Sequence, residues 1–424
     1  MKRLVFLTTW IFVATSLLAA QTLEITPNRA LVDEQAVIRA KGLQPNEHVT
    51  IHAQLTDGGQ QVWKSEADFV ADADDVVDTS KQAPAKGSYR EVSSMGLVWS
   101  MMPAEKKVVS YVSPHELQPQ VINFGLMRNG QQVSTAQLEQ LQIAYDIRRI
   151  TVKGKLHGVL FLPPGAGQHP GVMVLGGSEG GLSVPKAAWL ASHGFAALAL
   201  AYFRYEDLPG DLEAIPLEYF GEAIGWMMQR PEIAPDRIGV MGTSRGGELA
   251  LQLGSMYPQL KAVVAYVPAN VRFAACCGGT AVPFAWTWKG QPLTYVMPRM
   301  ADSAQAEMTA GIAAEHTYGA ILLIGAEDDG VWRSSSMTQA LADRLHRDHF
   351  AYDLELLKYP HAGHRAGRPE IVPTWHGKTR HPVSGREMDF GGSSEGDAES
   401  SIDAIPKVLK FLDDALANKP ESKQ

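Results

Sequence analysis

The sequence predicts an all-β domain followed by an α/β domain with a mostly parallel sheet. Short alternating strands separated by turn residues occupy the region 23–143, and apolar strands alternate with helices from about residue 171 onward. A serine between two glycines, within 242–246, stands where a strand runs directly into a helix. Strands that alternate with helices need crossover connections, which make neighbouring strands parallel.

Composition is that of an ordinary globular protein. The 424 residues allow two to three domains, with 45% apolar and 20% charged residues. The formal net charge is −8 and no long basic block is present, so nucleic acid is not an expected partner. The two cysteines, Cys276 and Cys277, are adjacent, and because neighbours rarely satisfy disulfide geometry we expect a free pair in a loop.

The N-terminus predicts export. Lys2 and Arg3 precede an apolar stretch over 4–18, and the small residues Ala19 and Ala20 follow it. This is the pattern of a signal peptide over residues 1–20, which indicates a periplasmic or extracellular protein. The alternative is an uncleaved N-terminal anchor. No second long apolar segment occurs, so we expect no integral membrane domain after cleavage.

Residues 21–145 predict a small immunoglobulin-like β-sandwich. Apolar and polar residues alternate over 49–56, and Asp57-Gly58 then turns the chain. Asn129-Gly130 indicates a second hairpin. Several short strands with turns between them are typical of two packed antiparallel sheets.

Residues 146–418 predict the α/β domain. Residues 150–162 look like a hairpin that leads into it, and the continuous apolar run at 172–175 is what a strand buried on both faces requires. A stretch rich in Trp, Pro and Gly predicts a lid-like insertion near 268–310. The other expected strands are 196–200, 237–241, 261–266 and 320–324, and the expected helices are 185–193, 219–228, 247–253 and 400–417.

The segment 242–246 predicts a nucleophile elbow, the turn that presents the reactive serine in α/β-hydrolases. Ser244 would stand clear of the sheet in a strained backbone conformation, and Gly242 and Gly246 would avoid a collision at positions two residues either side. The alternative is a glycine-rich turn with no chemistry.

A serine nucleophile needs a base and an orienting acid, which follow it in the order acid then histidine in this fold. After the strand at 320–324 we prefer Asp329 as the acid, because Gly330 and Val331 give it an anchoring turn, and Asp328 is the alternative. We prefer His364 over His361 as the base, because small residues before it would let the ring approach the serine.

An oxyanion hole needs two backbone N–H groups. One is expected from Arg245, directly after the nucleophile, and the other from the glycine-rich loop 176–181, near Ser178. A nucleotide-binding reading of that loop fits poorly, because it lacks the Lys-Ser/Thr ending of a phosphate-binding loop. A metal site is a further alternative, but the spacing of its residues matches no helical motif, so we expect no metal and no cofactor. Its candidate ligands are His361, His364, His376 and His381 with Asp328.

The motifs together resemble the family of acyl-CoA thioesterases and bile acid-CoA:amino acid N-acyltransferases, over nearly the whole chain after residue 20. They are GSY at 87–89, MGLVWSM at 95–101, LGGSEGG at 175–181, IPLEYF at 215–220, the elbow, DDGVW at 328–332 and YPHAGH at 359–364. The resemblance implies a β-sandwich before an α/β-hydrolase domain similar to dienelactone hydrolases. It also implies a triad of Ser244, Asp329 and His364.

The expected function is therefore that of an exported serine hydrolase, which cleaves acyl thioesters or carboxylic esters through an acyl-enzyme. The expected partner is a small-molecule substrate, and the oligomeric state stays open. In the family that it resembles, transfer to an amino acid goes with a cysteine nucleophile, whereas the nucleophile here is Ser244. We therefore expect hydrolysis, and an N-acyltransferase is the alternative. A non-catalytic exported binding protein is an alternative of another class.

Overall fold

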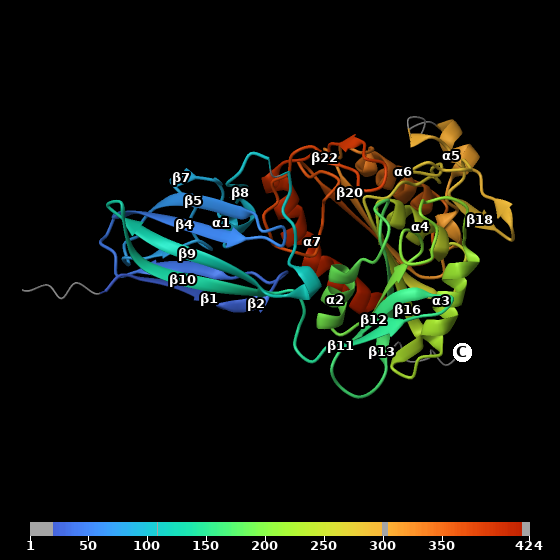
Figure 1. Ribbon diagram of the computed structural model, residues 1–424, viewed down its shortest axis with the longest axis horizontal. Coiled ribbons are helices and arrows are strands. Elements are labelled where there is room, and N and C mark those ends of the chain that lie inside the picture. Colours follow the sequence, from blue (N-terminus) through green and yellow to red (C-terminus); the bar gives the residue numbers. More distant parts are fainter. Residues whose placement is uncertain (1–19, 108, 299–303, 418–424) are drawn as a thin grey trace, which may run out of the picture.

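The computed structural model describes residues 20–107, 109–298 and 304–417. The predicted signal peptide falls almost wholly outside these ranges. A β-rich N-terminal part and an α/β C-terminal part lie side by side along the long axis, with α7 (Ser394–Ala415) between them (Figure 1). None of the helices in the described ranges is both long and apolar enough to cross a membrane.

The N-terminal part contains two β-sheets. Both predicted hairpins are confirmed: β4 pairs antiparallel with β5 after the turn at Asp57-Gly58, and β9 pairs antiparallel with β10 across Asn129-Gly130. The first sheet has the order β1-β3-β6 and the second has the order β2-β10-β9-β4-β5-β7, with β8 also on β5. The strands are β1 Thr22–Thr26, β2 Arg29–Leu31, β3 Val37–Lys41, β4 His48–Thr56, β5 Val62–Val70, β6 Val77–Asp78, β7 Lys86–Gly87, β8 Met102–Pro103, β9 Gln120–Arg128 and β10 Gln131–Leu141.

Alternation explains why these strands form sheets with one buried face. In β4, the side chains of Val49, Ile51, Ala53 and Leu55 are all buried while their neighbours are more exposed. Each fully buried large apolar side chain stabilises the fold by roughly 1.5–3 kcal/mol. The alternation predicted for this strand is therefore confirmed.

The C-terminal part is built on one eight-stranded sheet in the order β11-β12-β14-β13-β16-β17-β20-β21. The first two strands form the predicted entry hairpin, and β12 pairs antiparallel with β14, whereas every later pairing is parallel. The strands are β11 Arg148–Val152, β12 His157–Leu162, β13 His169–Leu175, β14 Ala196–Ala201, β16 Ile233–Thr243, β17 Leu260–Tyr266, β20 Ala320–Ala326 and β21 Leu354–Tyr359.

Helices cover both faces of this sheet, so its central strands have no polar face. Val172 and Val174 of β13 pack into a core with α2 and α7, while Met173 and Leu175 pack into a second core with α3, α4 and α6. The helices are α1 Gly96–Trp99, α2 Val184–Ser192, α3 Glu218–Met228, α4 Arg245–Gly254, α5 Ala304–Ala310, α6 Ser334–Arg347 and α7, with short 3₁₀ turns at His115–Leu117 and Ala314–His316.

The closing helix begins six residues before the predicted residue 400, at Ser394. Ser393 is its N-cap, since its hydroxyl accepts a hydrogen bond from the Gly396 N–H at 3.0 Å. Acidic residues Glu395 and Asp397 occupy the first turn, where the helix dipole favours them. The predicted start missed this cap because the stretch is polar and carries no apolar periodicity.

The predicted insertion contains β18, β19 and α5, and β18 also pairs with β15, which precedes the insertion, to give a small sheet in the order β15-β18-β19. Its strands are β15 Ile215–Pro216, β18 Trp286–Trp288 and β19 Gln291–Pro292, and a separate pair β22 Thr379–Arg380 and β23 Glu387–Met388 lies near the C-terminus. The predicted free cysteine pair is wrong. Cys276 and Cys277 form a disulfide, and the peptide bond between them is cis, which brings the two Cα atoms to 3.2 Å.

The two parts are joined by buried hydrogen bonds. The carboxylate of Asp33, in the N-terminal part, accepts from Trp189 Nε1 at 3.0 Å and from His193 Nε2 at 2.8 Å on the α2 side. Burial of His193 opposes its charged form, but the hydrogen bond and the charge of Asp33 outweigh burial and raise the pKa of the imidazole. Part of the stability of this boundary therefore depends on a protonated histidine.

The pH dependence of this pair gives a first prediction. A raised histidine pKa contributes stability that is fully present below the unfolded value of about 6.5 and is lost as pH rises through the folded value. We expect wild type to exceed Asp33→Asn in free energy of unfolding by roughly 1–3 kcal/mol near pH 5.5, and by less near pH 9. Chemical denaturation at both pH values measures this, with the exposed Asp74→Asn as control. A constant difference would contradict the assignment.

Candidate active site

The predicted elbow is present between β16 and α4. Ser244 has φ 61° and ψ −122°, a conformation that side-chain-bearing residues rarely adopt. A Cβ built on Gly242 would lie 1.9 Å from the carbonyl oxygen of Gly246, and one built on Gly246 would lie 2.3 Å from the carbonyl oxygen of Gly176. Both glycines are therefore required by the close approach of the backbone.

Ser244, His364 and Asp329 form one chain of hydrogen bonds. Ser244 Oγ lies 2.8 Å from His364 Nε2, and His364 Nδ1 lies 2.8 Å and 3.0 Å from the two carboxylate oxygens of Asp329. A carboxylate only accepts, so Nδ1 carries the proton and Nε2 is left to accept from the serine hydroxyl. The side chain of Asp329 is fully buried and also accepts from the Val331 and Trp332 N–H groups.

Two aromatic side chains fix the plane of the His364 ring. Trp332 packs edge-on against it with the ring centroids 4.7 Å apart, and Phe390 stacks on it with the centroids 6.2 Å apart. The backbone N–H of His364 also donates to the backbone carbonyl of Phe390 at 2.8 Å. Asp329 follows β20 and His364 follows β21, so both side chains reach the carboxyl edge of the sheet, where the elbow also lies.

The alternative acid and base lie outside this arrangement. Asp328 and His361 are both exposed and are 3.6 Å apart. The structure thus brings the preferred residues Asp329 and His364 to Ser244, and it leaves the alternatives at the surface.

The two residues predicted for an oxyanion hole are the residue after the serine and a residue of the loop that runs beside it. Arg245 is the first residue of α4, directly after Ser244. The loop that carries Ser178 runs beside the nucleophile, since a Cβ on Gly177 would lie 3.2 Å from the Ser244 Cβ. The Ser178 hydroxyl is 2.8 Å from His381 Nε2, so the segment around β22 and β23 holds this loop.

Sequence reasoning missed a buried ion pair beneath the elbow. The Arg245 guanidinium lies 2.9 Å from Glu248, and Glu248 accepts from Trp286 Nε1 at 2.7 Å. Arg245 also donates to the carbonyls of Ala274 and Phe273 at 2.8 Å and 3.1 Å. Burial raises the pKa of Glu248, against the opposing charge of Arg245. These contacts tie the insertion to the helix that follows the nucleophile.

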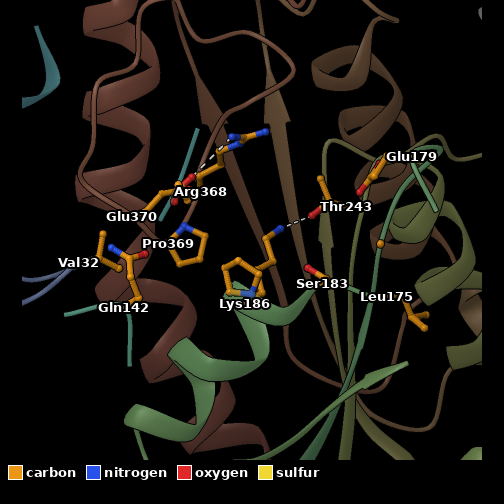
Figure 2. Close-up of a pocket in the computed structure, with 13 residues that line it drawn as sticks. Val32, Gln142, Leu175, Glu179, Ser183, Lys186, Thr243, Arg368, Pro369 and Glu370 are labelled. Carbon is orange, nitrogen blue, oxygen red and sulfur yellow. Dashed lines mark hydrogen bonds and ion pairs between the residues drawn. The ribbon is translucent and has the colours of Figure 1, made fainter. Parts of the chain in front are cut away.

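Sequence reasoning also missed Lys186, which lines a cavity of about 240 Å³ beside Thr243 (Figure 2). Its Nζ donates to the Thr243 hydroxyl and lies 4.2 Å from the centre of the Tyr266 ring. Burial, and then the charge of Arg368, lowers the pKa of Lys186 to about 7. The sequence feature that could have indicated this residue is a lysine in a helix whose other residues are mostly apolar.

The four histidines of the alternative metal site have separate partners. Beyond the pairs already described, His376 lies 3.5 Å from Asp397. In the described ranges, the group with metal-compatible spacing is His157 with Glu206 and Asp207, none of which was predicted. The two ring nitrogens of His157 already contact these carboxylates, with Nδ1 2.7 Å from Glu206 and Nε2 3.0 Å from Asp207.

The order of the sheet, its two layers of helices and the elbow define an α/β hydrolase. Residues 33–154 match the model of the acyl-CoA thioester hydrolase/BAAT N-terminal region, and residues 215–418 match that of the BAAT/acyl-CoA thioester hydrolase C-terminal region. The chain belongs to this acyl-CoA thioester hydrolase/BAAT family, as its motifs predicted. It is thus an enzyme of the thioester hydrolase type.

Relatives cover nearly the whole chain. Acyl-coenzyme A amino acid N-acyltransferase 1 of Mus musculus is 34% identical over 414 residues, which cover 91% of this chain and 96% of that protein. Acyl-coenzyme A thioesterase 6 of Homo sapiens is 30% identical over 433 residues, which cover 95% and 99%. Among solved structures, an α/β hydrolase from a Medee basin deep-sea metagenome library is 16% identical with a TM-score of 0.40, and it covers 64% of this chain and 98% of its own.

The crowded elbow gives a second prediction. Gly242→Ala would force the new methyl group into the Gly246 carbonyl, so we expect the free energy of unfolding to fall by about 1–3 kcal/mol or more. Gly210→Ala is the matched control, because its Cβ would meet no atom within 4 Å. Equal stability of the two variants in denaturant titrations would contradict this account of the turn.

Proposed function

We propose that the protein is an exported serine hydrolase that cleaves acyl thioesters of the acyl-CoA type or carboxylic esters. One observation carries the proposal, the buried chain of hydrogen bonds from Asp329 through His364 to the Ser244 hydroxyl. Membership of the family supports the thioester substrate.

In the proposed mechanism, His364 Nε2 takes the hydroxyl proton as Ser244 Oγ attacks the substrate carbonyl carbon. Asp329 holds the histidine tautomer and stabilises the imidazolium that forms. The backbone N–H of Arg245 and one from the loop near Ser178 would stabilise the negative oxygen of the tetrahedral intermediate. The imidazolium then protonates the leaving thiol or alcohol, and the acyl group stays on Ser244 as an ester.

The second half of the reaction uses the same groups. A water molecule attacks the acyl carbon while His364 takes one of its protons. The bond from that carbon to Ser244 Oγ then breaks, His364 returns the proton to Oγ, and the carboxylic acid is released. Transfer to an amino acid is the alternative, and the relative named as an N-acyltransferase favours it. We favour hydrolysis because the nucleophile here is a serine, whereas transfer in the family goes with a cysteine.

The proposal includes location and domain type. The pattern of residues 1–20 supports export to the periplasm or the extracellular space, where water is abundant and CoA conjugates are not assured. The pairings of the N-terminal sheets, antiparallel except for β2 with β10, support an immunoglobulin-like sandwich before the hydrolase domain. A purely binding role is disfavoured because the serine, the histidine and the acid are all retained.

The nucleophile gives a third prediction. Ser244→Ala should lower kcat for a model acyl thioester by a factor on the order of 10⁴ or more, because the acyl-enzyme cannot form. It should also abolish labelling by a fluorophosphonate probe. Circular dichroism checks that the variant is folded. A folded variant with near-normal turnover would rule Ser244 out as the nucleophile.

The acid gives a fourth prediction. Asp329→Asn should lower kcat by about 10⁴, because an amide favours the wrong histidine tautomer. Asp328→Asn is the adjacent control and should stay close to wild type, since that side chain is exposed beside His361. Steady-state kinetics of both variants decides the assignment, and the reverse ranking would move the acid by one residue.

A further inference from the structure

The hairpin of β22 and β23 is attached to the loops that carry the base and the acid. Its chain continues into Phe390, whose backbone carbonyl accepts from the backbone N–H groups of His364 at 2.8 Å and Gly330 at 3.1 Å. His381 directly follows β22, and its own backbone N–H donates to the Arg386 carbonyl at 2.8 Å. The backbone that carries the His381 ring is therefore tied, through the hairpin, to the triad.

Hydrogen bonds assign the tautomer of the His381 ring. Its Nδ1 accepts from the backbone N–H groups of Val383 at 3.2 Å and Ser384 at 3.1 Å. A ring nitrogen that accepts carries no proton, so the proton of the neutral imidazole is on Nε2. This Nε2 lies 2.8 Å from the Ser178 hydroxyl oxygen and therefore donates to it. Because His381 is only 7% exposed, water competes little for either nitrogen.

The surroundings of His381 favour the neutral ring. Burial is the largest cause that lowers the pKa of this imidazole, and the charge of Arg204 lowers it further, whereas the charge of Glu179 raises it. A protonated ring would point an Nδ1–H at two N–H donors and would open the turn at 383–384. The hold of His381 on Ser178 therefore depends on the neutral form.

The N–H groups of the glycine-rich loop differ in their partners. The Gly177 N–H donates to the Glu179 carboxylate at 3.0 Å, and the N–H groups of Gly180 and Gly181 have backbone acceptors at 3.3 Å and 3.1 Å. In the part of the chain that the structure describes, the N–H groups of Ser178 and Glu179 have no acceptor. Ser178 also follows Gly177, which lies against the nucleophile. Its N–H is therefore available for a substrate oxygen.

We propose that His381 is a positioning residue of the oxyanion hole. Its Nε2–H holds the Ser178 side chain, and with it the Ser178 N–H, in place for the negative oxygen of the tetrahedral intermediate. The imidazole takes part in no proton transfer, and its contribution is to fix a donor before the reaction starts, as electrostatic stabilisation requires. The proposal deepens the proposed hydrolase function and rests on it.

Two substitutions separate the roles of the two ring nitrogens. In His381→Asn the amide oxygen can replace Nδ1 and accept from the turn, but no group donates to Ser178. In His381→Gln the amide nitrogen can replace Nε2 and donate to Ser178, but the turn loses its acceptor. The two variants therefore break different contacts of the same ring.

We expect His381→Asn to lower kcat for a model acyl thioester by about ten- to a hundredfold and to change KM by less than about threefold, because an oxyanion donor acts on the transition state more than on the bound substrate. His381→Gln should lower kcat less. Circular dichroism checks that both variants are folded, and His346→Asn, at an exposed histidine of α6, is the control. Equal kcat for the two variants, or the reverse ranking, would overturn the proposal.

Ser178→Ala tests whether the effect passes through the hydroxyl. This variant keeps the backbone N–H and removes the group that His381 holds. We expect it to lower kcat about as much as His381→Asn, and we expect the double variant to be no slower than either single variant, because both changes break one contact. Effects that multiply in the double variant would overturn the proposal.

The pH dependence of kcat gives a readout that a purely structural role would not move. As pH falls through the pKa of His381, wild type loses the Ser178 contact, whereas His381→Gln has no ring to protonate. Protonation of His364 lowers kcat in both proteins and cancels in their ratio. We expect the ratio of wild-type kcat to that of His381→Gln to fall at pH values below about 6.5, because the pKa of His381 is lowered from its ordinary value. A ratio independent of pH would overturn the proposal.

A measurement without turnover separates this proposal from the proposed function. NMR of protein with isotopically labelled histidine nitrogens, at mildly alkaline pH, should show a protonated Nε2 and a bare Nδ1 for the signals that His381→Asn removes. The opposite tautomer would overturn the proposal. Wild-type hydrolysis that both His381 variants leave unchanged would overturn this proposal alone, whereas no hydrolysis by wild type, with the expected tautomer present, would overturn the hydrolase function.

Discussion

The left-handed backbone at Ser244 is the constraint on which the site depends. It lifts the serine hydroxyl off the end of β16 and starts α4 at the next residue, Arg245. Such a conformation persists only where its surroundings enforce it. Here the enforcement is steric, because Gly242, Gly246 and the end of β13 are in backbone contact.

Burial and charge then arrange the other groups around that turn. Asp329 is a fully buried carboxylate, which is tolerable because two N–H groups and an imidazole N–H satisfy it. Below the elbow, the Arg245 and Glu248 pair meets the same requirement with partners from the insertion. Lys186 differs from both, since a hydroxyl and a ring face its charge.

The sequence was informative wherever the cause was local. Gly242 reveals the elbow because its collision partner, Gly246, lies four residues further along the chain. Asp329 and His364 could be placed because each follows an apolar strand. Lys186 could not be placed, because its enclosure depends on Arg368 and on residues of the N-terminal part that lie far away in the chain. The disulfide of Cys276 and Cys277 was missed for a different reason, because adjacent cysteines rarely satisfy disulfide geometry and a free pair was therefore expected.

The two faces of β13 have a consequence for how the molecule unfolds. Val172 and Val174 belong to a core that continues through α2 and α7 into the N-terminal sheets, as far as Phe69 and Phe124. The boundary between the two architectural parts is thus not a boundary between two hydrophobic cores. A chain cut near residue 145 would expose apolar surface on both pieces. We therefore expect the N-terminal sheets and the eight-stranded sheet to unfold together rather than as two modules joined by a linker.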